Sequence, residues 1–165
     1  MNKNINLFDV LQNSTLGAIA IHSFILGYNN VAKHKANKQS YPKIDYLFFV
    51  LPIVYDYKSL KSIKYKLDTS IDENKELTLG LQNKADRMSR QTLDSLNMGF
   101  NKLIFKLNKE NYTVELTEDC QKEITVLMKF SNDTIKDIQI ISKRLGNIFA
   151  KRDEKKIQIE LNIRF

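Results

Sequence analysis

The chain has 165 residues, with 26 Lys and Arg against 19 Asp and Glu, and a net charge of +7. Its 42% apolar content can fill a hydrophobic core, and no Gly, Ser or Pro tract marks a linker, so we expect residues 1–165 to form a single domain. A lone cysteine, Cys120, excludes an intrachain disulfide and a cysteine-rich metal site. The first residues lack the pattern of a signal peptide, which predicts a cytoplasmic protein.

The first predicted element is a buried helix that begins at Asn13 or Ser14. Both residue types accept hydrogen bonds from the backbone of the first helical turn. Apolar residues then recur at helical spacing as far as Tyr28. Residues 29–42 are polar, and we expect them to form a basic, mobile loop.

The next segment is "YLFFVLPIVYDYKSLKSI", residues 46–63. Its apolar run is shorter than the roughly 20 residues that a membrane-spanning helix needs, so we expect no membrane segment here. Proline is tolerated in an edge strand or in the first turn of a helix. An edge strand broken at Pro52 and a helix running from about Leu51 to Ile63 both remain open, and helical spacing of apolar residues favours the helix.

The spacing of apolar residues over residues 67–100 predicts two helices. Leu77 and Leu81 belong to the first, and Gly99 is placed to end the second. The apolar positions of the second helix recur at helical spacing at Ala85, Met88, Thr92 and Leu96.

A β-hairpin follows these helices. In residues 103–107, Leu103, Phe105 and Leu107 alternate with Ile104 and Lys106. After a polar turn at residues 108–111, Tyr112, Val114 and Leu116 alternate with Thr113 and Glu115, which is the pattern of a hairpin. Two helices and a hairpin have the order of a winged helix. We therefore predict a mainly α fold with a small β-hairpin, winged-helix-like over about residues 70–116.

The C-terminal part, residues 117–165, is predicted to be helical. Thr117 can cap a helix over residues 118–130, and Asn132 or Asp133 can cap a second one with an apolar stripe ending at Phe149. Residues 155–165 alternate like a strand but could also form a short helix, and both alternatives remain open.

The predicted second helix and the hairpin share a set of basic side chains. They are Lys84, Arg87 and Arg90 on the helix, with Lys102, Lys106 and Lys109 on the hairpin. Such a surface could contact DNA phosphates or a partner protein. Asp86 and Asp94 interrupt it, so an ordinary solvated helix face is the alternative.

The residues that usually perform catalysis are sparse. His22 lies in the apolar predicted helix and His34 in the basic loop, and nothing in their spacing suits metal ligands. We expect His22 to be a core or interface histidine. Cys120 has no evident partner base, and the scattered glycines form no phosphate-binding loop. We therefore expect no enzyme activity, no metal and no cofactor.

Three stretches together resemble a known family. They are "NSTLGAIAIHSFILGY", the segment ending in Leu-Pro at residues 51–52, and "SKRLGNIFAKRDEKKIQIELNIRF". The family is the middle component of three-component ABC systems, which include Lamassu-type antiphage defence. The matching positions, which the resemblance implies are core or interface residues, are Leu16, Gly17, Leu51, Pro52, Leu145, Gly146 and Phe149.

The resemblance also implies a role. Such a protein would be a non-enzymatic adaptor that joins an SMC- or Rad50-like ABC ATPase to an effector, often a nuclease, within a cytoplasmic hetero-oligomer that senses foreign DNA. The alternative is a stand-alone winged-helix transcriptional regulator, which the basic side chains around Arg87 and Arg90 would suit.

Overall fold

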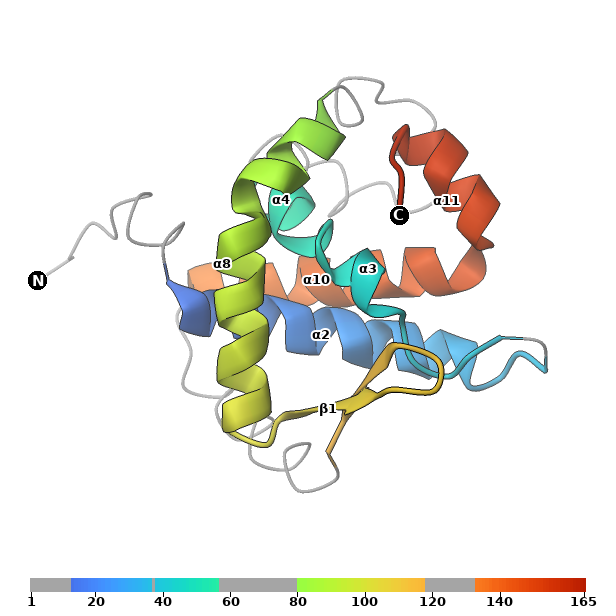
Figure 1. Cartoon of the computed structure of the whole chain (residues 1–165), viewed down its shortest axis with the longest axis horizontal. Coiled ribbons are helices and arrows are strands. Elements are labelled where there is room, and N and C mark those ends of the chain that lie inside the picture. Colours follow the sequence, from blue (N-terminus) through green and yellow to red (C-terminus); the bar gives the residue numbers. More distant parts are fainter. Residues whose placement is uncertain (1–12, 37, 57–79, 118–132) are drawn as a thin grey trace, which may run out of the picture.

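The computed structural model describes residues 13–36, 38–56, 80–117 and 133–165 (Figure 1). In these ranges the chain is mainly helical with a two-stranded antiparallel hairpin, which confirms the predicted fold class. The elements are α2 (Ser14–Ala32), α3 (Ile44–Leu47), α4 (Val50–Val54), α8 (Leu81–Asn101), β1 (Phe105–Asn108), β2 (Thr113–Leu116), α10 (Asp133–Lys151) and α11 (Glu154–Leu161). The helices predicted around Leu77 and over 118–130 lie outside the described residues, so the winged-helix-like portion stays a prediction.

Helix α2 begins where the sequence predicts. The side chain of Asn13 accepts hydrogen bonds from the backbone N–H groups of Thr15 and Leu16, at 2.9 and 3.2 Å, and so caps the first turn. The helix continues to Ala32, so the loop expected from residue 29 starts later than predicted. No glycine or proline follows Tyr28 before Pro42, and the backbone has no local reason to leave the helix earlier.

Helices α2 and α10 lie side by side and form the most extensive helix pair of the described structure (Figure 1). Two glycines allow this approach. A Cβ atom on Gly146 would overlap the carbonyl oxygen of Phe24 and lie 2.8 Å from the backbone nitrogen of Tyr28. A Cβ atom on Gly27 would overlap the backbone carbonyl of Lys143. The two helices are therefore close to backbone contact, which only glycine permits at these positions.

Helix α8 crosses α2 on another side (Figure 1). A Cβ atom on Gly17 would overlap the hydroxyl of Ser95 and lie 3.3 Å from a methyl carbon of Leu51. Leu51 belongs to α4, so α4 also packs at the point where α2 and α8 cross, and it contacts both helices. The Leu-Pro segment thus fills the space beside this crossing.

Aromatic rings join the C-terminal part to this core. Phe149 meets Phe24 edge-on at a ring-centroid distance of 5.3 Å and Tyr46 at 5.7 Å. Phe165 packs on Tyr46 at 4.7 Å and on Phe49 at 5.5 Å. Aromatic pairs in this range stabilise a fold beyond the area they bury.

The Leu-Pro segment forms the short helices α3 and α4, so the edge-strand alternative is wrong. Pro52 lies in the first turn of α4, where its missing N–H group costs no intrahelical hydrogen bond. The helix ends at Val54, and Asp56 pairs with Lys84 of α8 two residues later. Residues 57–63 lie outside the described ranges.

The limits of α8 differ from the prediction at both ends. Leu81, assigned from the sequence to the preceding helix, is the first residue of α8, because Gly80 before it has a left-handed backbone (φ 73°). Gly99 does not end the helix, which continues to Asn101. A Cβ atom there would overlap the ring of Phe105, so Gly99 lets the hairpin pack on the helix.

The predicted hairpin is confirmed. Phe105 pairs with Leu116 and Leu107 with Val114, so these apolar side chains share the face toward the core. The edge of β2 that does not pair with β1 is hydrogen-bonded to the chain before α3. The N–H of Val114 donates to the carbonyl of Pro42 at 3.0 Å. The hairpin is therefore fixed to the helical core along this edge.

The C-terminal alternation is a helix, α11, and the strand reading is wrong. Asp153 accepts a hydrogen bond from the backbone of Lys156 at 2.7 Å and caps the helix. The alternating isoleucines placed Ile157 and Ile159 on one face of a supposed strand, but in the helix Ile157 is buried and Ile159 is 79% exposed. The apolar stripe predicted for α10 is confirmed.

Candidate partner and DNA contact surface

The structure places the family-motif positions mainly inside the chain. Leu51, Leu145 and Phe149 are almost completely buried. Pro52 is also buried, and Leu16 is half-buried at the start of α2. Because the glycines of the set lie at helix crossings, these residues pack against other parts of the same chain and leave little surface for a partner.

The basic side chains predicted on α8 do not form a uniformly positive face. The Nζ atom of Lys84 lies 2.7 Å from a carboxylate oxygen of Asp56. Arg87 and Arg90 are exposed, but so are Asp86 and Asp94 on the same helix. The formal charges of these four exposed side chains cancel, which is typical of a solvated helix face.

The basic side chains of the hairpin are a separate group. Lys102, Lys106 and Lys109 are all exposed. Since an α-helix rises 1.5 Å per residue, Lys102 lies about 22 Å from Arg87 along α8. Glu115 opposes Lys106 across the hairpin, but its carboxylate also accepts a hydrogen bond from the amide of Asn108 at 3.1 Å. Glu110, next to Lys109 in the turn, is also exposed, so the hairpin keeps only a small excess of positive charge. The predicted surface thus divides into a charge-balanced helix and a weakly basic hairpin.

Two apolar side chains at the ends of the hairpin point outward. Leu103 is 75% exposed and Tyr112 is 65% exposed, although both continue the alternation of buried residues such as Phe105 and Val114 in the sequence. Each has a left-handed backbone with φ 55°, and a residue in that conformation breaks the strand alternation. Leu and Tyr carry no sequence signal for this conformation, which is why sequence reasoning missed these residues.

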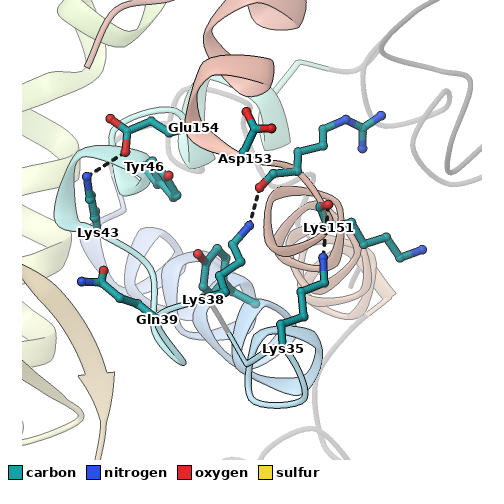
Figure 2. Close-up of a pocket in the computed structure, with 10 residues that line it drawn as sticks. Lys35, Lys38, Gln39, Lys43, Tyr46, Lys151, Asp153 and Glu154 are labelled. Atoms are coloured by element: carbon teal, nitrogen blue, oxygen red, sulfur yellow. Dashed lines mark hydrogen bonds and ion pairs between the residues drawn. The ribbon is translucent and has the colours of Figure 1, made fainter.

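The basic loop after α2, which the sequence predicts to be mobile, contacts the C-terminal end of α10 through two lysines. Figure 2 shows Lys35 and Lys38 directed at the C-terminal end of α10. Lys35 donates to the carbonyls of Ala150 and Lys151 at 3.1 and 3.2 Å, and Lys38 donates to that of Phe149 at 3.0 Å and to that of Arg152. Ammonium groups at a helix C-terminus satisfy unpaired carbonyls and interact favourably with the helix dipole.

These lysines line a pocket of about 450 Å³ between the loop, α10 and α11 (Figure 2). Lys38 lies over the ring of Tyr28, 5.4 Å from its centroid. Burial, with the nearby charge of Lys35, lowers the pKa of Lys38 to about 8. On the opposite wall, Lys43 pairs with Glu154 at 2.7 Å. These three cations of the pocket are thus already directed to acceptors of the chain itself, and we assign the pocket a structural role.

His22 lies within α2 and is 3% exposed. Neither of its ring nitrogens has a hydrogen-bond partner in the described part of the structure. Burial disfavours the charged imidazolium and lowers the pKa of His22 to about 4. His22 is therefore an uncharged core side chain at neutral pH.

We expect acid to destabilise the protein through His22. The pKa of this side chain rises from about 4 in the folded state to its ordinary value of 6.5 on unfolding, so the unfolded chain binds the proton more readily. Above pH 6.5 the titration of His22 does not lower the free energy of unfolding. As the pH falls from 6.5 toward 4, the free energy of unfolding decreases by about 3 kcal/mol in total. Urea unfolding at a series of pH values should show this loss in the wild type and not in His22→Leu.

If the stability curves of the wild type and His22→Leu run parallel between pH 6.5 and 4, the proton uptake has been assigned to the wrong group.

Other candidates for chemistry remain isolated. Within the described residues, no three His, Cys, Asp or Glu side chains are grouped so that they could hold a metal ion. Cys120 lies outside those residues. In the same part of the chain, no helix combines the length and the apolar character that crossing a membrane requires.

Comparison with known proteins gives one family. Neither the curated proteins nor the solved structures contain a significant match. The family model of the ABC-three component (ABC-3C) system Middle Component 3 matches residues 1–165, which is the whole sequence. The buried Leu-Pro segment and the glycine crossings are thus features of a chain that belongs to the Middle Component 3 family of ABC three-component systems.

Proposed function

We propose that this protein is a non-enzymatic adaptor that bridges an SMC-like ABC ATPase and an effector, such as a nuclease, in an antiphage defence complex of the Lamassu type. The observation that carries the proposal is the family match over the whole chain, because a middle component belongs to a system with further subunits. In such a complex the ATPase senses foreign DNA and the effector acts once it is released.

The arrangement of the chain supports this role. Its family-motif residues are used for internal packing, so partner contacts have to be made by other parts of the surface. The exposed lysines of the hairpin offer such a part, and they can meet either acidic side chains or DNA phosphates. Phosphate contacts by scattered lysines carry no base specificity, so DNA affinity would come mainly from the ATPase.

The test is co-expression with the proteins encoded on either side of the gene, followed by purification through a tag on this chain. Both neighbours should co-purify, and light scattering should report a single complex. When this chain is omitted and the tag is placed on the ATPase instead, the effector should no longer co-purify with the ATPase. A complex of the two that forms without this chain would contradict the bridging role.

The alternative, a stand-alone winged-helix regulator, makes a different prediction for the isolated chain. A regulator binds its own sequence at least ~10³-fold more tightly than other DNA at physiological salt. The adaptor should show only non-specific dissociation constants of about 10⁻⁴ to 10⁻⁶ M that weaken steeply with salt. Fluorescence anisotropy with unrelated duplexes separates the two functions.

A further inference from the structure

The two outward-facing apolar residues of the hairpin contribute little to the fold and are strained. Leu103 and Tyr112 are 75% and 65% exposed, so neither gains much from burial. Both have φ 55°, a conformation in which Cβ crowds the backbone and which glycine adopts without this cost. In the isolated chain, glycine would suit both positions better.

The unfavourable backbone conformation of an exposed apolar residue is clearest at the end of α8. The N–H of Leu103 donates to the carbonyl of Phe100 at 3.0 Å, and the N–H of Ile104 donates to that of Gly99 at 2.8 Å. This pair of bonds is a Schellman motif, whose left-handed position is usually glycine or asparagine. The end of α11 follows the same pattern with Asn162 at φ 51°. Helix α8 thus has an exposed leucine at the position where glycine or asparagine is expected.

Both residues are also held rigidly. The hydroxyl of Thr117 donates to the carbonyl of Leu103 at 2.5 Å. The N–H of Ile44 donates to the carbonyl of Tyr112 at 2.9 Å. Side chains presented on a fixed backbone lose less conformational entropy when a partner binds them. Strained residues that the surrounding structure holds in place are also concentrated at functional sites.

From these observations we infer that the hairpin is the docking surface for an acidic protein partner, with Leu103 and Tyr112 as its apolar anchors. The surface is defined as Lys102, Leu103, Lys106, Lys109 and Tyr112. Its two anchors lie at opposite ends of the hairpin, Leu103 two residues before β1 and Tyr112 one residue before β2. The four residues of β1 between these ends span about 13 Å, and a surface of this size fits within a standard protein interface. The inference rests on the proposed function, because the partner is a subunit of the same complex.

Charge and chemistry together indicate the kind of partner. The three exposed lysines of the surface outnumber the exposed carboxylate of Glu110 in the same turn, and they favour carboxylates on the other side. A leucine offers no hydrogen bond to a base or phosphate, and it contributes to binding only when apolar atoms cover it. Tyrosine is among the residues that dominate protein interfaces. An acidic protein surface with an apolar pocket satisfies all three features, whereas DNA offers no apolar pocket for the leucine.

The experiment uses the full chain and the purified neighbour-encoded ATPase and effector as probes. Leu103→Gly and Tyr112→Gly should leave the melting temperature unchanged or raise it by up to about 3 °C, because the strain is released. Each should weaken binding to one subunit by at least about tenfold. Replacing the three lysines by Ala should weaken the same binding and flatten its salt dependence. Ile159→Ala on α11 removes a comparably exposed apolar side chain and should change neither property.

The possible outcomes are distinct. If wild-type protein binds a subunit and both glycine variants bind it equally well, the docking surface is elsewhere, while the adaptor function stands. If the glycine variants lower the melting temperature, the side chains serve the fold and the inference is wrong. If DNA binding falls but subunit binding does not, the hairpin contacts nucleic acid instead. If wild-type protein binds neither subunit, the proposed function and the inference both fail.

Discussion

Gly146→Ala will destabilise the protein by about 3 kcal/mol or more, the reverse of the usual effect of alanine in a helix. In an ordinary helix interior this change is favourable by about 1 kcal/mol. Here the added carbon would overlap the carbonyl oxygen of Phe24 and approach the backbone of Tyr28, so α2 and α10 would have to separate. Overpacking costs about 1–3 kcal/mol where side chains can move, and backbone atoms yield less.

Thermal unfolding measures this effect directly, since 3 kcal/mol corresponds to a loss of about 6–12 °C for a chain of this size. Gly27→Ala, on the facing helix, should give a similar loss because its Cβ would overlap the backbone of Lys143. Lys143→Ala, at an exposed position of α10, is the control and should change the melting temperature little. A Gly146→Ala variant as stable as the wild type would mean that the helices are farther apart than described.

Leu51→Asp should leave no folded protein at 25 °C. Leu51 is 0% exposed and lies beside the crossing of α2 and α8, so the new carboxylate would have neither water nor a counter-charge. Burying an unpaired charge belongs to the few changes that cost more than about 4–5 kcal/mol. That loss approaches the whole stability of an ordinary domain, about 5–15 kcal/mol. Far-UV circular dichroism and the yield of monodisperse protein measure the outcome.

Leu51→Met is the matched control, because it keeps the apolar volume and should cost less than about 1.5 kcal/mol. If Leu51→Asp kept the wild-type spectrum and still joined the complex, the Leu-Pro segment would be a surface feature. The charge would then be solvated, and the family motif would have to be explained as an interface.

Local signals predicted the elements whose cause is local. The Asn13 cap, the apolar stripe of α10 and the strands around Phe105 and Val114 all depend on neighbours within a few residues, and the structure has them. The C-terminal end was ambiguous for the same reason. Apolar residues two positions apart, such as Ile157 and Ile159, are the pattern expected of a strand. The helix that this segment forms depends on packing against the core, which the local pattern does not contain.

The candidate site was less predictable because its features depend on distant parts of the chain. Lys35 caps a helix end 115 residues away, which no spacing rule can reveal. The balance of charge on α8 depends on which face the core covers, and the pairing of Lys84 with Asp56 depends on where α4 ends. Leu103 and Tyr112 follow strand alternation in the sequence, and only the left-handed backbone turns them outward.

The pairing of α2 with α10 also sets the time at which this protein can fold during synthesis. A ribosome adds about 5–20 residues per second, so α2 must wait on the order of ten seconds before its partner helix emerges. During that interval Phe24 and the rest of the buried face of α2 cannot be covered by α10. The nascent chain therefore exposes this apolar face during synthesis, and α10 can cover it only after the chain has been made beyond residue 151.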